Sequence, residues 1–141
     1  MKYLFAFLII FSAHSAVAKD WYEGAWMFDP HLTQEHNPGI NSHSMATVRD
    51  GFDKWAGRVE VTPRRIKGKK AKMGVPYRVV GGSSEAVVVE VKGGVVGIVK
   101  AFNPNLRNTK LRCKITRVNH GIVAFEVPEL RTIKMYMRQV R

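Results

Sequence analysis

With 141 residues, of which 45% are hydrophobic and 24% charged, the chain has the composition of a single globular domain. Its one cysteine excludes an internal disulfide framework and a cysteine-only zinc site. The formal net charge of +12 is unevenly distributed along the sequence. Residues 19–60 hold four basic and seven acidic residues, whereas residues 61–141 hold eighteen basic and four acidic ones.

The first 18 residues have the pattern of a secretory signal peptide. Met1-Lys2 gives a basic start, nine apolar residues follow up to Phe11, and small residues end the segment at Ala16-Val17-Ala18. The apolar run is too short to span a bilayer. We therefore expect a mature domain over residues 19–141, without a transmembrane segment, in the periplasm or outside the cell. The alternative is a buried N-terminal strand or helix.

The N-terminal third of the mature chain carries one strand pattern and two helix patterns. Residues 21–28 predict a first strand. Asp29 and Pro30 suit the N-cap and first position of a short helix, which Asn37-Pro38-Gly39 ends. Ser44 is expected to cap a second helix, whose apolar residues recur at spacings of three and four. This apolar stripe consists of Met45, Val48, Phe52 and Trp55.

From residue 58 onward the apolar residues follow a period of two, which predicts strands. Residues 58–62 alternate first, and Gly, Pro and Asn then divide the remainder into further segments. These predicted strands cover residues 75–80, 85–92, 95–102, 109–118, 122–127 and 132–140. Gly93-Gly94 is expected to form a two-residue hairpin between the second and third of them. Short turns between successive strands indicate an antiparallel meander.

The later strands have one apolar and one basic face, as in Leu111, Cys113 and Ile115 against Arg112 and Lys114. Such a sheet hides its edges most simply by closing. The sequence therefore predicts a mainly β fold: an antiparallel up-and-down barrel of about eight strands with one or two short N-terminal helices. The lumen of such a barrel holds either packed side chains or one small ligand.

The chain resembles small bacterial secreted proteins of the lipocalin-like (calycin-type) class. The resemblance rests on Gly24-Ala25-Trp26 in a first strand, a Pro-started helix, a strand meander and the closing Met135-Tyr136-Met137-Arg138. It implies that residues 19–141 form a lipocalin-like barrel in which Trp26 plugs one end and Arg138 packs across the indole. The second helix, over residues 44–55, departs from the pattern, because lipocalins continue there into strands.

The sequence predicts no catalytic site, no cofactor and no enzyme. Three histidines near carboxylates, His31, His36 and His43, are weak candidates for a metal site, but no two of them have the spacing of a ligand pair on a helix. Their polar surroundings favour an exposed loop. Cys113 alternates inward and is expected to be a buried, unreactive thiol; the alternative is intermolecular pairing.

A basic segment is the most unusual feature of the chain. Its six cations are Arg64, Arg65, Lys67, Lys69, Lys70 and Lys72. We expect a protruding, glycine-broken loop that binds an anionic envelope component or an acidic protein; the alternative is a solvated loop without a partner. Aromatic residues are scarce around it, which argues against specific nucleic-acid binding.

These features favour a secreted or periplasmic, non-enzymatic binding protein of the cell envelope, whose ligand is a small apolar molecule or an anionic partner. The alternative is a periplasmic inhibitor or immunity-type protein that neutralises an envelope enzyme or toxin. A third class is an envelope hydrolase built on the Asp- and His-rich N-terminal segment. An open lumen favours the first class, and a filled barrel under a protruding charged loop favours the second.

Overall fold

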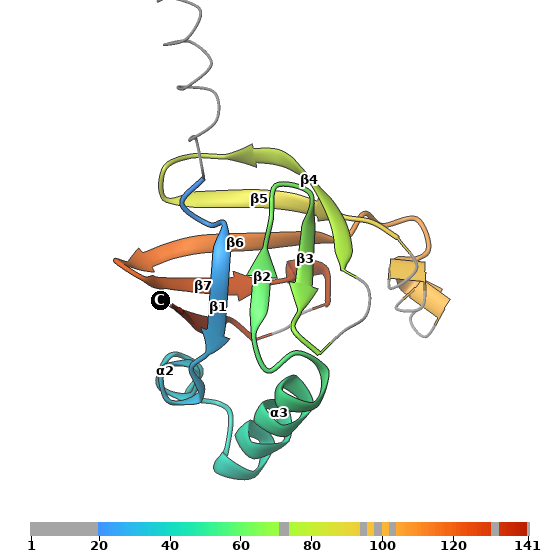
Figure 1. The fold of residues 1–141 in the computed structure, drawn as a ribbon. Coiled ribbons are helices and arrows are strands. Elements are labelled where there is room, and N and C mark those ends of the chain that lie inside the picture. Colours follow the sequence, from blue (N-terminus) through green and yellow to red (C-terminus); the bar gives the residue numbers. More distant parts are fainter. Residues whose placement is uncertain are drawn as a thin grey trace, which may run out of the picture.

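The computed structural model describes residues 20–70, 74–93, 96–97, 100–101, 104–130 and 133–140, except for the side chains of Trp55 and Leu130. The predicted signal peptide, residues 1–18, therefore lies outside the described residues. The strands are β1 (Gly24–Phe28), β2 (Val59–Val61), β3 (Arg65–Gly68), β4 (Val75–Gly82), β5 (Ala86–Val91), β6 (Arg112–Asn119), β7 (Ile122–Glu126) and β8 (Met135–Gln139). Each pairs antiparallel with the next, and β8 pairs with β1, so the sheet closes into a barrel (Figure 1). The predicted fold class is confirmed.

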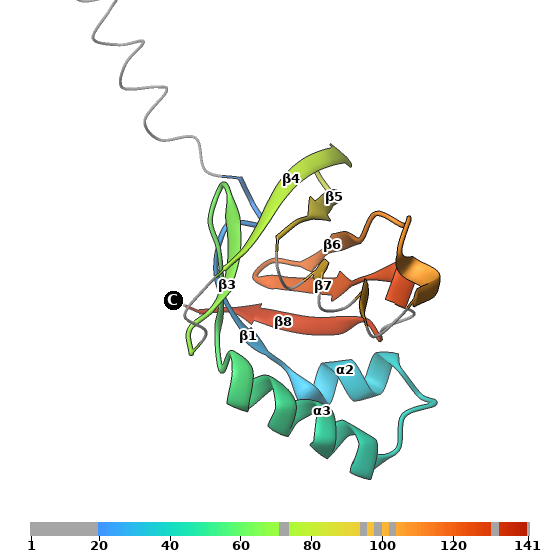
Figure 2. The same cartoon turned by 90° about the vertical axis from the view of Figure 1, so that its right-hand side faces the viewer.

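Two helices connect β1 to β2 and lie together beside one end of the barrel (Figure 2). The first, α2 (Pro30–His36), begins as predicted: the side chain of Asp29 accepts a hydrogen bond of 2.9 Å from the Leu32 N–H. The second, α3 (Ser42–Trp55), begins two residues before the predicted N-cap. Asn41 is the N-cap instead, because its side chain accepts the N–H of Ser44 at 2.8 Å. Two single-turn 3₁₀ helices, η1 (Pro104–Leu106) and η2 (Pro128–Leu130), precede β6 and β8.

One predicted strand is wrong. The sequence suggests a hairpin from β5 into residues 95–102, but β5 pairs directly with β6, with Val89 opposite Cys113. The described residues 96, 97, 100 and 101 have helical backbone instead. A short apolar run does not distinguish a strand from a helix by its periodicity, and the barrel closes without these residues.

The basic segment is also different from its prediction. Four of its nine residues are not a protruding loop, because Arg65–Gly68 forms β3 and pairs with β2 on one side and β4 on the other. Ile66 lies opposite Val61 and faces inward with it, so one apolar residue between cations is enough to place this segment in the barrel wall.

The barrel interior is filled at the end where the chain enters β1. The core side chains of this half include Tyr22, Trp26, Val61, Tyr77, Val87, Val89, Ile115 and Val123. Trp26, Val89, Ile115 and Val123 are each at most 2% exposed. The helices lie at the opposite end, where β1 and β3 finish (Figure 1). The two ends of the interior are therefore built differently.

Candidate functional site

A cavity of about 590 Å³ occupies the barrel interior at the end beside α3. α3 contributes one wall through Val48, Gly51 and Phe52. The strands and the residues next to them contribute most of the rest, from the end of the barrel nearest α3. These residues are Val59, Ile66, Val75, Val91, Leu111, Cys113, Phe125, Glu126, Val127, Ile133, Met135 and Met137, and Thr47 and Val96 complete the described lining. The core residues named above for the filled half, such as Trp26 and Val123, do not line it.

The strand side chains that border the hollow on this side of the barrel are short. On β2 to β5 the inward positions near α3 are held by Val59, Ile66, Val75 and Val91, aliphatic residues too short to reach across the lumen. At the filled end the same space receives the rings of Tyr22, Trp26 and Tyr77. α3 borders the opening through Val48 and Phe52, and the ring of Phe52 lies 5.3 Å from the ring of Phe28. These two residues of the predicted apolar stripe thus line the cavity.

The chemistry of the lining is apolar. Among the described residues that line it, only Thr47, Cys113 and Glu126 have oxygen or thiol groups in their side chains. Burial raises the pKa of the Cys113 thiol to about 12, although the backbone N–H of Glu126 acts in the opposite direction. The thiol is 6% exposed and neutral at physiological pH, so it behaves as a small hydrophobe. The described lining therefore suits an uncharged apolar group.

Trp26 lies inside the barrel, in the half that is filled by core side chains. It is 2% exposed, and its indole Nε1 donates to the carbonyl of Tyr22 at 3.0 Å. Arg138 does not lie where the resemblance to lipocalins implies. It lies opposite Met27 on the outer face of the sheet and binds the carboxylate of Asp29, so it does not pack across the indole. The reason is alternation, since Met137 takes the inward position on β8.

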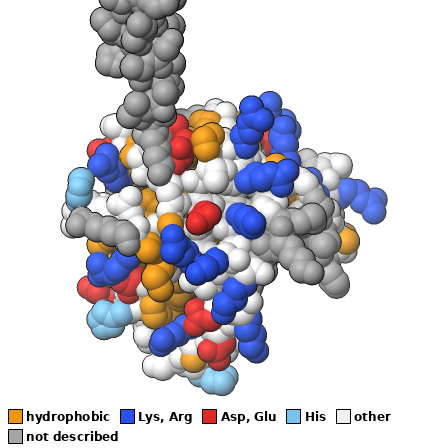
Figure 3. Space-filling model, in the orientation of Figure 1, with side chains coloured by type: hydrophobic (Ala, Val, Ile, Leu, Met, Phe, Trp, Pro, Cys, Tyr) orange, Lys and Arg blue, Asp and Glu red, His pale blue; other side chains and the backbone are white. Residues whose placement is uncertain are grey.

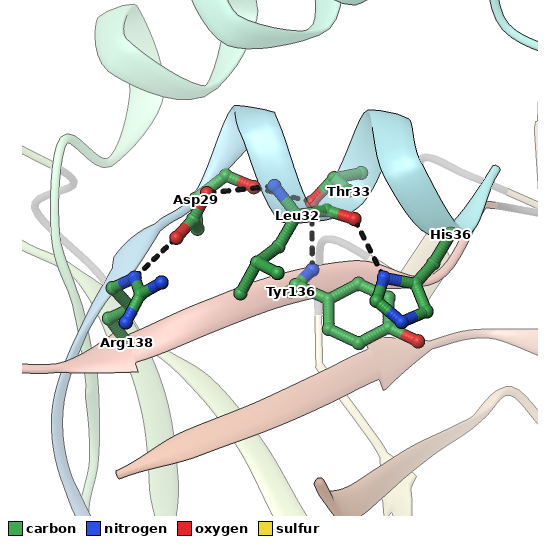
Figure 4. Close-up of polar contacts among 6 residues, drawn as sticks. All are labelled: Asp29, Leu32, Thr33, His36, Tyr136 and Arg138. Atoms are coloured by element: carbon green, nitrogen blue, oxygen red, sulfur yellow. Dashed lines mark hydrogen bonds and ion pairs between the residues drawn. The ribbon is translucent and has the colours of Figure 1, made fainter. Parts of the chain in front are cut away.

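Arg138 belongs to a polar network that attaches α2 to the outside of β8 (Figure 4). The hydroxyl of Thr33 accepts the Tyr136 N–H at 2.9 Å and donates to the carbonyl of Asp29 at 2.7 Å. His36 stacks on the ring of Tyr136 with 4.4 Å between ring centroids. Tyr136 is consequently 7% exposed, although it points outward from the barrel. These contacts hold the helical pair beside the cavity.

The predicted cations are divided by the fold. Arg65 and Lys67 are exposed on the outer face of β3, and Arg64 lies in the turn before it. Lys70 donates through Nζ to the carbonyl of Asp53 near the end of α3 at 2.5 Å. Lys69 follows β3, and Lys72 lies outside the described residues. Figure 3 shows Lys and Arg side chains gathered over β2 and β3.

The predicted histidines are not brought together. His36 is committed to Tyr136 and to the carbonyl of Leu32, and His43 is exposed on α3. His31 borders a polar groove between α2 and α3 with Arg49, Asp50 and Asp53. Within the described part of the chain, no three His, Cys, Asp or Glu residues are grouped closely enough to hold a metal ion.

The cavity residues are the functional candidates that sequence reasoning misses. The alternation does identify inward positions such as Cys113 and Val91, but it does not decide whether they pack against other side chains or face a ligand. One sequence signal points to the cavity: the apolar stripe that contains Val48 and Phe52. This stripe lies on a helix that is not part of the barrel wall, so its apolar side chains can be buried against one end of the barrel.

None of the helices in the described residues is both long and apolar enough for a membrane span. In comparisons with known proteins, the chain matches no family model, no curated protein and no solved structure.

Proposed function

We propose that the mature chain is a secreted or periplasmic, non-enzymatic protein that binds a small apolar ligand in the cavity beside α3. The observation that carries the proposal is the cavity itself, about 590 Å³ in volume and bounded almost wholly by aliphatic, aromatic and methionine side chains. Sites for small molecules typically have volumes of about 300–1,000 Å³ and are mostly apolar. The volume and the lining both fit this class.

Kinship with lipocalin-like secreted proteins is part of the same proposal. It is supported by Gly24-x-Trp26 on β1 and by an eight-stranded barrel with an interior hollow. The export signal over residues 1–18 supports a location outside the cytoplasm.

The inhibitor or immunity-type alternative is less well supported. The features that favour it are a filled barrel and a protruding charged loop. Here the barrel has an unfilled half, and four of the expected loop residues form β3 within its wall. A protein that acts only through its outer surface gains nothing from an interior hollow, which forfeits packing and so destabilises the fold.

The experiment is titration of the mature protein with N-phenyl-1-naphthylamine, a neutral apolar dye whose fluorescence rises when it leaves water. We expect saturable binding with one site per chain. Val91→Phe places a larger side chain into the cavity and should weaken the dye's affinity at least tenfold, a loss of about 1.4 kcal/mol of binding free energy.

The matched control is Val118→Phe, which adds the same atoms at a position that is 45% exposed. It should leave the affinity unchanged. Circular dichroism and the thermal midpoint establish that both variants are folded. Equal dye binding by Val91→Phe, Val118→Phe and the unaltered protein would remove the cavity as the site.

A further inference from the structure

The outer surface of β2 and β3 concentrates positive charge on one wall of the barrel. We call this surface the cationic face and define it by five residues: Arg58, Arg64, Arg65, Lys67 and Lys69. The last four are exposed, and the side chain of Arg58 is 37% exposed. In β3 the cations alternate with inward residues, so Arg65 and Lys67 point the same way.

Few opposing charges neutralise this face. Between residues 58 and 78 the sequence contains a single acid, Glu60. Glu60 lies opposite Lys67 in the β2–β3 register and approaches Arg58 at 3.9 Å between Nη2 and Oε1. Within this stretch of the chain, one carboxylate stands against the five cations, which leaves a positive excess. In an extended strand, positions 65 to 68 span about 10 Å, so the excess forms a strip rather than a point.

The cationic face and the cavity share a wall. Ile66 lies between Arg65 and Lys67 in the chain and lines the cavity from the opposite side of the strand. Val59 on β2 also lines it, next to Arg58 and Glu60. At the end of this wall, Lys70 is bound to the carbonyl of Asp53 in α3. A surface that docks against these cations is therefore separated from a ligand in the cavity by the thickness of the barrel wall.

We propose that the cationic face docks the protein on an anionic lipid surface. The inference deepens the proposed function, because apolar ligands partition into membranes and a carrier has to meet one to load or unload. Cationic residues near an anionic leaflet each strengthen binding about fivefold.

Nucleic acid fits this face less well than lipid. Single-stranded nucleic acid is bound by basic grooves with aromatic platforms on which bases stack. The outward positions of β2 and β3 are Glu60, Arg65 and Lys67, and Tyr77 on the adjoining strand is buried, with its hydroxyl donating to the carbonyl of Thr62. The face thus offers charge without stacking partners.

The test is flotation of the mature protein with vesicles of pure phosphatidylcholine and with vesicles that also contain phosphatidylglycerol. We expect binding only to the anionic vesicles, and a steep loss of it with added salt. Arg65→Gln combined with Lys67→Gln should lower the partition coefficient at least tenfold. Glu60→Gln should raise it, because it removes the one carboxylate of the face.

The matched control is Lys114→Gln combined with Lys134→Gln, which makes the same change of net charge at exposed positions on β6 and before β8. It should retain most of the binding. An equal loss in this control would mean that net charge alone acts, and would overturn the proposal. Absence of binding to anionic vesicles, or tighter binding to polyuridylate than to them, would overturn it too.

The docking proposal and the proposed cavity site can be tested independently of each other. The Arg65→Gln, Lys67→Gln variant should bind N-phenyl-1-naphthylamine as tightly as the unaltered protein, because both side chains point away from the cavity. Loss of vesicle binding with dye binding retained is the expected combination. Loss of dye binding in the same variant would mean that it damages the barrel. Glu60→Gln is then compared with Glu85→Gln, which removes the same charge at an exposed position before β5. A docking face predicts tighter vesicle binding from the change at Glu60 than from the change at Glu85.

Discussion

Arg138 on β8 binds the carboxylate of Asp29, which lies 109 positions earlier in the sequence. The other oxygen of the same carboxylate accepts the N–H of Leu32 and so caps α2. One side chain thereby begins the helix and attaches it to the last strand, at the seam where β8 pairs with β1.

Asp29→Ala should lower the free energy of unfolding by about 1–2 kcal/mol. Loss of an N-cap typically costs about 1 kcal/mol, and an ion pair with a half-exposed arginine adds less than that. Urea denaturation measures the change. Glu35→Ala, at an exposed position of the same helix, is the control and should stay within about 0.5 kcal/mol of the unaltered protein.

The same carboxylate should make stability depend on pH. Burial by itself raises the pKa of Asp29, but the Leu32 N–H and Arg138 outweigh it and hold the pKa below the ordinary value of 3.8. A depressed pKa in the folded state means that this contribution is present above pH 3.8 and is lost as the pH falls through the folded pKa. Asp29→Asn keeps a capping oxygen but does not titrate. Its stability deficit should therefore shrink below about pH 4; a deficit that stays constant with pH contradicts the assignment.

Trp26→Ala should destabilise the barrel by about 3–5 kcal/mol, because it empties a large buried volume and leaves the carbonyl of Tyr22 without its donor. Chemical denaturation followed by circular dichroism gives the value. A loss of less than about 1 kcal/mol would mean that the indole does not close this end of the barrel.

Cys113 should react slowly with a bulky thiol reagent in the native protein and rapidly after unfolding in urea. Burial raises its pKa to about 12, so the reactive thiolate is scarce at neutral pH. Because the thiol lines the cavity, saturating N-phenyl-1-naphthylamine should slow the native reaction further. A native rate equal to the unfolded rate would place Cys113 outside the barrel.

Gly51→Ala should stabilise the protein by about 1 kcal/mol, because glycine weakens a helix interior by that amount relative to alanine. A Cβ at this position meets nothing within 4 Å. Gly82→Ala is the opposite case: its φ is +152° and its Cβ would lie 2.8 Å from the carbonyl oxygen of Ala86. The thermal midpoint should rise for the first variant and fall for the second.

The sequence predicts the barrel well because alternation is local. For a residue such as Ile115, the polar neighbours Lys114 and Thr116 are enough to predict that its side chain faces the barrel interior. The same logic fails where the local signal is thin. β3 has a single apolar side chain, Ile66, between cations. One apolar residue shows no alternation, so the pattern predicts a loop. Residues 95–102 contain many apolar residues, but β5 pairs with β6 in their place.

The cavity was beyond the reach of the sequence for a different reason. Whether Val91 and Leu111 pack against another side chain or face a void depends on how eight strands close and where α3 rests. Neither is a property of any one segment. The Arg138 partner was missed for a related reason, since outward position on β8 is set by the inward Met137, and Asp29 reaches it only through the closure of the barrel.

The most direct test of the apolar site is methyl NMR of the isoleucine and methionine side chains during titration with N-phenyl-1-naphthylamine. Ile66, Ile133 and Met135 line the cavity, whereas Ile115 is fully buried in the filled half and Met27 is 50% exposed on the outside. We predict shifts at the three cavity methyls, with little change at Ile115 or Met27. Shifts at Met27 with none at Ile66, Ile133 and Met135 would contradict the account.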